Sequence, residues 1–216
     1  MRPLGTCTTD STGLIVTLTR GRFFDPSWAT LPFCIGGNGV EANATLQSVQ
    51  SQRQVTLTGP IGPYLTPVAF APTRETIYQA FYNKMTAGVP GLKTTKRRSL
   101  LFGDLPPEQQ PALFIEEVGQ NPESSQRGLK YKWELDVVLG LYVFNSDTDQ
   151  VFPTMNPILD WIEATLPGDD PQSPGGNPQT LGGLVYWVRL TGDGKAYSGA
   201  KGGQGFAYLP ARITTF

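Results

Sequence analysis

The chain has 216 residues, of which 39% are apolar, and its formal net charge is −1, so it is long enough to bury one large core or two small ones. It contains no histidine, which excludes Ser-His-Asp triads, HExxH metal sites and Cys2His2 fingers. The balanced charge argues against a dedicated nucleic-acid-binding protein, because phosphate neutralisation needs a clustered excess of lysine and arginine.

The two cysteines, Cys7 and Cys34, are too few for a four-thiolate zinc site, and we expect both to be free thiols. No segment that resembles a secretory signal precedes them. No apolar run approaches the roughly 20 residues that cross a bilayer. We therefore expect a soluble chain with no membrane contact, no cofactor and no metal.

Residues 1–71 are poor in charge and contain only seven of the 35 charged residues. Short runs such as residues 13–19 and 54–58 are rich in β-branched residues and are bounded by glycine or proline, as strands are. We predict an all-β arm or small domain here, with a loosely ordered segment as the alternative. The glycines and prolines of residues 59–63 predict a linker to the next part of the chain.

A helix is predicted at the start of the second part of the chain, residues 72–216. Thr73 is a suitable N-cap, and Gly88 is a suitable stop. Between them the apolar side chains recur at the helical spacing of i, i+3, i+4 and i+8, which predicts one buried stripe. These side chains are Ile77, Ala80, Phe81 and Met85.

The longest predicted strand covers residues 130–144. Alternation of this length marks a strand with one buried face. Toward its end Val138, Tyr142 and Phe144 make the second face apolar as well, which predicts a cover by a helix, an arm or another subunit. A shorter strand is predicted at residues 112–116. The apolar odd positions of the long strand are Tyr131, Trp133, Leu135, Val137, Leu139, Leu141 and Val143.

A second helix is predicted after the long strand. Asn156 is a suitable N-cap with Pro157 at the first helical position, and Pro167 is expected to stop the helix. The following residues 168–178 are expected to form an exposed loop. The predicted core stripe of this helix is Ile158, Ile162 and Leu166.

Two strands are predicted near the end of the chain, at residues 184–190 and 206–213. The glycine-rich residues 191–205 between them are interpreted as a hairpin connection. Pro210 has no N–H for a ladder, so we expect the last strand to lie at a sheet edge or to contain a bulge.

None of the motif-like patterns predicts a catalytic, cofactor-binding or metal-binding residue. Residues 37–42 match the G-x-G-x-x-A form, but no carboxylate follows at the distance that binds ribose, so a turn is favoured. Glu116 and Glu117 would point to opposite faces of a strand. Asp169 and Asp170 lie in the predicted exposed loop.

The one local concentration of charge lies at residues 93–98. A solvated loop is the plainest interpretation. In an oligomeric ring, however, these cations would repeat around a circle and could meet a phosphate backbone or an acidic partner surface. The four cations are Lys93, Lys96, Arg97 and Arg98.

The order of these elements resembles the tail terminator (tail completion) proteins of long-tailed bacteriophages, the lambda-like minor tail proteins. The resemblance covers residues 72–216, and residues 1–71 have no counterpart in the compact family members. The matching features are the helix at 74–85, the alternating strand at 131–143, the short helix at 157–166, the run Thr180-Leu181-Gly182-Gly183-Leu184-Val185 and the strand at 208–213.

The resemblance implies an α+β fold with a central, mostly antiparallel sheet flanked by two or three helices, assembled as a homohexameric ring. Such a ring is a virion protein without enzymatic activity, assembled in the host cytoplasm. It caps the tail-tube protein, ends tube polymerisation and offers its other face to the head-tail connector protein at the head-proximal end of the tail. Phage DNA would pass transiently through its lumen.

In such a ring the cations of residues 93–98 would line the lumen or face a partner, and Val138, Tyr142 and Phe144 would contact a neighbouring subunit. Residues 1–71 would embrace that neighbour or decorate the exterior of the ring. A head-closure or adaptor ring between portal and tail is the alternative function. A third alternative, a small enzyme that uses carboxylates or lysine, requires a deep pocket with convergent carboxylates.

Overall fold

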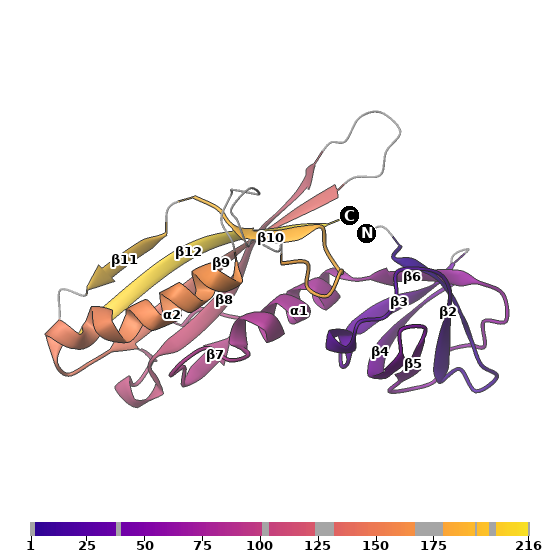
Figure 1. Ribbon diagram of the computed structural model, residues 1–216, viewed down its shortest axis with the longest axis horizontal. Coiled ribbons are helices and arrows are strands. Elements are labelled where there is room, and N and C mark those ends of the chain that lie inside the picture. The colour runs from indigo at the N-terminus through magenta and orange to yellow at the C-terminus, as the bar shows by residue number, and fades with distance from the viewer. Residues whose placement is uncertain are drawn as a thin grey trace.

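The chain folds into a small β-barrel and a larger α+β part, which lie end to end in an elongated molecule (Figure 1). The structure is a computed structural model, and it describes residues 3–37, 40–100, 104–123, 132–166, 179–192, 194–198 and 202–215. Three predictions fall outside these residues: the start of the long strand at residues 130–131, the helix stop at Pro167, and the loop at residues 168–178 with Asp169 and Asp170.

Six antiparallel strands of the N-terminal region close into a barrel in the order β1-β2-β5-β4-β3-β6. Aromatic side chains fill the interior, where the rings of Phe33 and Phe70 stack with centroids 4.6 Å apart. The predicted β-rich region is therefore a small closed barrel, without the free strand edge that an arm would present. Its strands are β1 (Gly5–Thr9), β2 (Ile15–Gly21), β3 (Pro32–Gly37), β4 (Val40–Ser51), β5 (Gln54–Leu57) and β6 (Val68–Pro72).

The predicted linker at residues 59–63 is instead a loop of the barrel between β5 and β6. The Ile61 N–H donates to the Gly13 carbonyl at 3.0 Å. Gly13 has a φ of +70°, and the Ile61 carbonyl oxygen lies 1.8 Å from where its β-carbon would be, so this approach requires glycine. The linker prediction was wrong because prolines and glycines mark any chain reversal, including one inside a domain.

Both cysteines lie in barrel strands as free thiols, as predicted, with Cys7 in β1 and Cys34 in β3. Cys7 is fully buried, and burial raises the pKa of its thiol to about 12. The thiol therefore stays protonated at neutral pH and packs as a small apolar side chain.

The larger part is a six-stranded sheet in the order β10-β12-β9-β8-β7, with β11 also paired to β12. All strand pairs are antiparallel except β7 with β8. Two α-helices flank the sheet among the described residues, which confirms the α+β class with a mostly antiparallel sheet. The elements are α1 (Arg74–Thr86), β7 (Thr94–Lys96), β8 (Ala112–Glu123), β9 (Lys132–Phe144), α2 (Val151–Thr165), β10 (Trp187–Leu190), β11 (Lys195–Ser198) and β12 (Gln204–Thr214).

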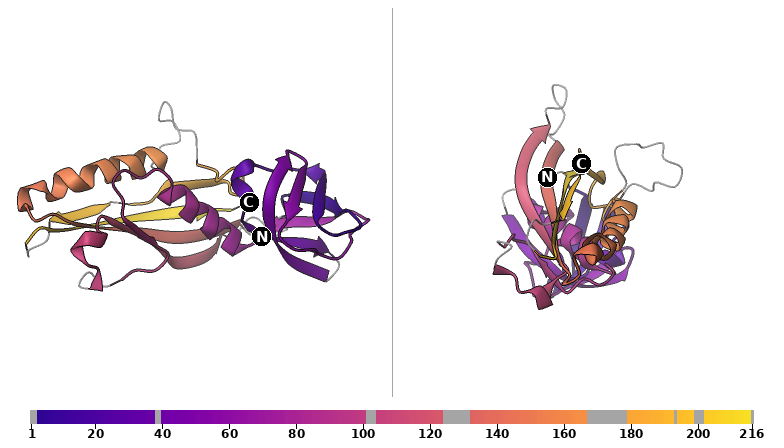
Figure 2. Two further views of the ribbon diagram at one scale, coloured as in Figure 1. Left: turned by 90° about the horizontal axis from the view of Figure 1, so that it is seen from below. Right: turned by 90° about the vertical axis from the view of Figure 1, so that its left-hand side faces the viewer.

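Both helices pack on one face of the sheet, which we name the covered face (Figure 2). Val151 and Met155 of α2 leave no room for a side chain at Gly205 of β12. The Tyr82 hydroxyl of α1 bonds to the Thr95 hydroxyl of β7 at 2.8 Å. The two helices therefore lie over different strands of the same face.

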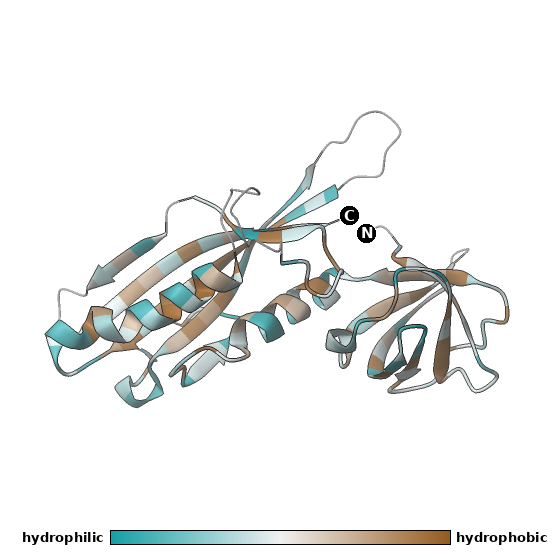
Figure 3. Cartoon of the chain, in the orientation of Figure 1, coloured by the Kyte–Doolittle hydropathy of each residue, from teal (hydrophilic) through white to brown (hydrophobic). Residues whose placement is uncertain are grey.

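On β9 the odd positions from Leu135 to Val143 are buried in the core that the helices cover and Trp133 is half-buried, which confirms the predicted alternation. Figure 3 shows how hydropathy is distributed along the strands of the sheet. The even positions of β9, from Glu134 to Phe144, form the opposite face, which we name the open face. Neither α1 nor α2 covers it, but the 3-10 helix η3 (Pro107–Gln109) and the segment before it pack at its Phe144 end. The buried odd positions are Leu135, Val137, Leu139, Leu141 and Val143.

The helix α1 has the predicted limits. The Thr73 hydroxyl accepts from the Thr76 N–H at 3.1 Å, and the Thr76 hydroxyl accepts from the Thr73 N–H at 2.8 Å. This reciprocal capping box satisfies two donors that the helix itself leaves unpaired. Gly88 follows the end of the helix with a left-handed φ of +83°. Of the predicted stripe, Ile77, Phe81 and Met85 are fully buried and Ala80 is half-buried against the core.

The helix α2 begins six residues before its predicted first residue, so the prediction of Asn156 and Pro157 as its start was wrong. Val151 and Met155 extend the buried stripe of Ile158 backward at helical spacing. Burial of each side chain contributes about 2 kcal/mol. Together they exceed the cost of about 3 kcal/mol for a proline inside a helix. The apolar stripe therefore decides where the helix begins.

The strand predicted at residues 184–190 begins only at Trp187. Residues 181–183 take left-handed backbone angles, which form turns and prevent an earlier strand. The connection predicted at residues 191–205 contains the additional strand β11.

The strand β12 lies inside the sheet, so the prediction of an edge or a bulge at Pro210 was wrong. On one side β12 pairs with β9 along its whole length. On the other side it pairs with β10 through residues 211–214 and with β11 through residues 205–208. Pro210 faces the gap between these two strands, where no ladder bond needs its missing N–H.

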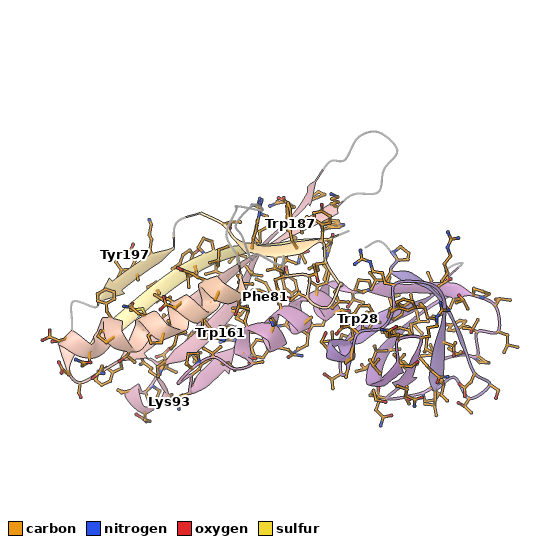
Figure 4. All side chains as sticks on the ribbon, viewed as in Figure 1. Trp28, Phe81, Lys93, Trp161, Trp187 and Tyr197 are labelled. Carbon is orange, nitrogen blue, oxygen red and sulfur yellow. The ribbon has the colours of Figure 1, made fainter. Side chains whose placement is uncertain are left out.

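A turn at residues 180–185 connects the α+β part to the barrel. Arg22 Nη1 of the barrel donates to the Gly183 carbonyl at 2.5 Å. A β-carbon on Gly182 would lie 2.6 Å from Ser27 Oγ and 2.9 Å from the indole nitrogen of Trp28. The turn therefore packs directly against the barrel at Trp28 (Figure 4).

A second contact joins the barrel to α1, where the Thr76 hydroxyl donates to the Pro32 carbonyl of β3. The buried side chains of both parts form one continuous hydrophobic cluster. The barrel and the α+β part therefore share a packed boundary.

We predict that Pro157→Ala raises the free energy of unfolding by about 2 kcal/mol, because it restores an N–H that can donate to the Pro153 carbonyl. Pro153→Ala is the matched control. Pro153 lies in the first turn, where N–H groups have no helical partner, so this change should alter stability by less than about 0.5 kcal/mol. Urea unfolding followed by circular dichroism measures both. Equal effects would contradict a role of the helix hydrogen bond.

We predict that Gly182→Ala lowers the free energy of unfolding by about 3 kcal/mol, since it adds a clash with the barrel to the cost of a left-handed alanine. Gly183→Ala should cost only about 1 kcal/mol, because Gly183 has a similar φ of +86° and its β-carbon would meet only Arg22 Nη1, at an ordinary contact distance of 3.5 Å. Thermal unfolding compares the two variants. A Gly182→Ala protein as stable as Gly183→Ala would rule out the tight contact.

Candidate partner-binding surfaces

The predicted basic cluster lies at the β7 edge of the sheet. β7 is the edge strand and pairs in parallel with β8. Lys93 precedes β7 in the chain, Lys96 is its last residue, and Arg97 and Arg98 follow it. Lys93, Lys96 and Arg98 are exposed. In Figure 4 Lys93 lies at the opposite side of the sheet from Tyr197 of β11.

Arg97 differs from the other three cations because it is held inside the chain. Its guanidinium forms ion pairs with Glu75 of α1 and Glu117 of β8, and Nη2 also donates to Glu75 Oε2 at 3.0 Å. The hydrogen bond to Glu75 and then that to Glu117 raise the pKa of Arg97, despite partial burial. The cluster therefore presents three exposed cations to a partner.

The predicted subunit contact lies on the open face of β9. Val138 is buried, and Tyr142 is partly covered by the segment before β8, to whose Leu100 carbonyl its hydroxyl donates at 3.2 Å. Burial, with a smaller effect of Glu116, raises the pKa of Tyr142. A segment of the same chain thus covers part of this face, and the contact of Val138, Tyr142 and Phe144 with another subunit stays a prediction.

A row of aromatic side chains crosses four strands of the open face. Tyr197 of β11 pairs with Phe206 of β12, which pairs with Tyr142 of β9. The ring centroids of Phe206 and Tyr142 are 5.2 Å apart, and those of Tyr142 and Phe114 of β8 are 5.1 Å apart. Tyr197 is 53% exposed and the neighbouring Tyr208 is 41% exposed. Exposed rings on an otherwise packed face are typical of a protein-binding surface.

A cleft of about 210 Å³ opens beside this row, between Phe144 and the loop that contains Pro106 and Pro107. Gln110 lines the cleft and is 2% exposed. Its Nε2 donates to the Leu105 carbonyl at 3.1 Å, while its Oε1 has no hydrogen-bond partner among the described residues.

The open face becomes charged toward the barrel. Arg212 of β12 bonds to Asp136 at 2.7 Å and to Glu134 at 3.0 Å, both on β9. Beside it the Arg189 guanidinium lies 4.9 Å from the centroid of the Trp187 ring. The ion pairs of Arg212 are formed within the chain, so we interpret this end as structural.

A groove of about 620 Å³ lies on the covered face between α2 and the β10–β11 side of the sheet. Leu159, Leu190 and Leu209 line it, and Glu163 and Lys195 lie among its polar residues. The groove exists because α2 packs on β9 and β12 and leaves the sheet beyond them uncovered.

The patterns that could suggest an enzyme have structural explanations. Gly37 ends β3 and pairs with Val40 of β4, whose strand continues through Ala42, so no helix begins in residues 40–42 to bind a phosphate. Glu116 accepts a hydrogen bond from Ser99, while Glu117 pairs with Arg97, and they occupy opposite faces as predicted. In the described ranges no cluster of acidic and cysteine side chains could hold a metal ion. The described helices are too short or too polar to cross a membrane.

No protein-family model matches the chain, and no curated protein matches its sequence. The resemblance to tail terminators therefore stays a prediction from the order of the sequence patterns.

Two features of these surfaces, the aromatic row and the partners of Arg97, were not predicted from the sequence. Tyr197 and Phe206 pair across β11 and β12, which could not be foreseen because β11 was interpreted as a loop. Tyr208 and Phe206 are two residues apart and so share a face, a signal that the sequence does contain. The partners of Arg97 lie 20 and 22 residues away in sequence, beyond any local pattern.

We predict that Arg97→Met lowers the free energy of unfolding by about 1 kcal/mol, because Glu75 and Glu117 lose a shared partner that is itself partly exposed. Arg98→Met is the control, since it removes the same charge from an exposed side chain and should change stability by less than about 0.5 kcal/mol. Urea unfolding in low salt measures the difference, and 1 M NaCl should reduce it. Equal losses would contradict the internal role of Arg97.

Proposed function

We propose that this chain is the subunit of a tail terminator ring, which caps the tail tube of a long-tailed bacteriophage. In this role it ends tube polymerisation and forms the interface for joining to the head-tail connector. It acts as a structural virion protein at the head-proximal end of the tail.

The observation that carries the proposal is the order of elements in the α+β part. Helix α1, the long strand β9, helix α2, the turn at residues 180–185 and the terminal strand β12 follow one another along the chain, which is the order that suggested the resemblance. Neither α-helix covers the open face, and the exposed Tyr197 and Tyr208 lie on it. Such a surface favours a subunit that completes its packing against other proteins.

Two surfaces have roles in this proposal. The open face at Tyr142 and Phe144, with the adjoining Val138, takes part in the contact between subunits. The three exposed cations of the β7 edge face a partner protein. The barrel offers no free strand to extend a neighbouring sheet, so we place it on the exterior of the ring.

Light scattering of the purified chain across concentration, alone and with tail-tube protein, tests the proposal. We expect an assembly of about six times the 23.5 kDa of the chain, either in solution or once tube protein is added. A monomer that ignores the tube protein contradicts the proposal. Binding to a portal-side protein instead of the tube would favour a head-closure adaptor.

A further inference from the structure

We propose that neighbouring subunits of the ring join head to tail through opposite charges at the two sides of the sheet. The β7 edge of one copy, with Lys93, Lys96 and Arg98, contacts the acidic surface around α2 of the next copy. This inference rests on the proposed function, because it names the partner of the basic cluster within the ring.

The acidic surface is formed by α2 and the turn before it. Residues 146–166 contain four carboxylates and no lysine or arginine. All four side chains are exposed, and none of them forms an ion pair within the described part of the chain. Their charge is therefore available to a partner. The four residues are Asp147, Asp149, Asp160 and Glu163.

The basic edge carries a matching charge. Arg97 is neutralised by Glu75 and Glu117, which leaves three exposed cations against the four carboxylates. The chain as a whole has a net charge of only −1, so overall repulsion does not oppose self-association. Attraction between the two patches can therefore select the orientation of neighbouring copies.

The positions of the two surfaces determine the symmetry of the contact. β7 is the last strand at one side of the sheet, whereas α2 packs on β9 and β12 toward the β11 side. Figure 4 shows Lys93 and Tyr197 at these opposite sides. Two different surfaces on opposite sides make a heterologous contact, which generates a closed ring when the rotation between copies permits.

The groove beside α2 supplies an apolar centre for this contact. Leu159 and Leu209 line it, with the acidic Glu163 and the exposed Lys195 of β11 among its polar residues. On the basic edge the half-buried Leu92 directly precedes Lys93. An apolar centre with a charged rim is the usual composition of a specific interface.

Charge reversal on each side tests the pairing. The first variant, Lys93→Glu with Lys96→Glu and Arg98→Glu, has acidic groups on both sides. The second, Asp160→Lys with Glu163→Lys, carries cations on the β7 edge and also on the surface around α2. Each alone should associate about tenfold or more weakly than the unchanged chain, because like charges now meet. An equimolar mixture should restore the ring, since the two chains can alternate around it.

Mass measured by light scattering, with circular dichroism to verify folding, gives the result. Lys84→Glu is the control, because it reverses an exposed charge on α1 outside both surfaces and should leave the ring intact. Full-size rings from either variant alone, or no recovery in the mixture of folded variants, would overturn the pairing and leave the terminator role standing. If the unchanged chain forms no ring even on tube protein, the proposed function itself fails.

Discussion

The pairing of β9 on both sides is the constraint on which the rest of the α+β part depends. Its residues pair with β12 along one side and with β8 along the other. A slip by one residue would bring Glu134 and Asp136 under the helices and expose Leu135 and Val137. Each such leucine or valine would lose about 2 kcal/mol of burial, and each carboxylate would lose its solvation or its pairing with Arg212. This register is therefore strongly determined.

The same register also decides which side chains near β7 stabilise the fold and which are exposed to a partner. On β7, Thr95 bonds to α1 on the covered face, while Lys96 pairs with Phe114, which lies on the open face. Arg97 returns to the helix side and binds Glu75 and Glu117. Adjacent cations of one cluster thus have different roles because successive side chains of a strand point to opposite faces. The run of charge in the sequence divides into one structural arginine and three exposed groups.

Patterns with a short period were sufficient to predict β9 and α1. The alternation of β9 extends over most of its length, and Thr73 begins a stripe whose spacing only a helix satisfies. The start of α2 was missed because Pro157 has a strong local preference that the burial of Val151 and Met155 outweighs. The ion pairs of Arg97 and the aromatic row across β11, β12 and β9 were beyond prediction, since they depend on strand order.

The position of the barrel is compatible with a ring made through the sides of the sheet. The barrel packs on the turn at residues 180–185 and on α1, so it lies beyond the ends of the sheet strands (Figure 1). A barrel beside β7 would instead occupy the space that a neighbouring copy needs. Because the tight approach at Gly182 and the shared core keep it in place, the barrel adds mass along the long axis of each subunit. A domain can thus be added to a ring-forming subunit without blocking either side of its sheet.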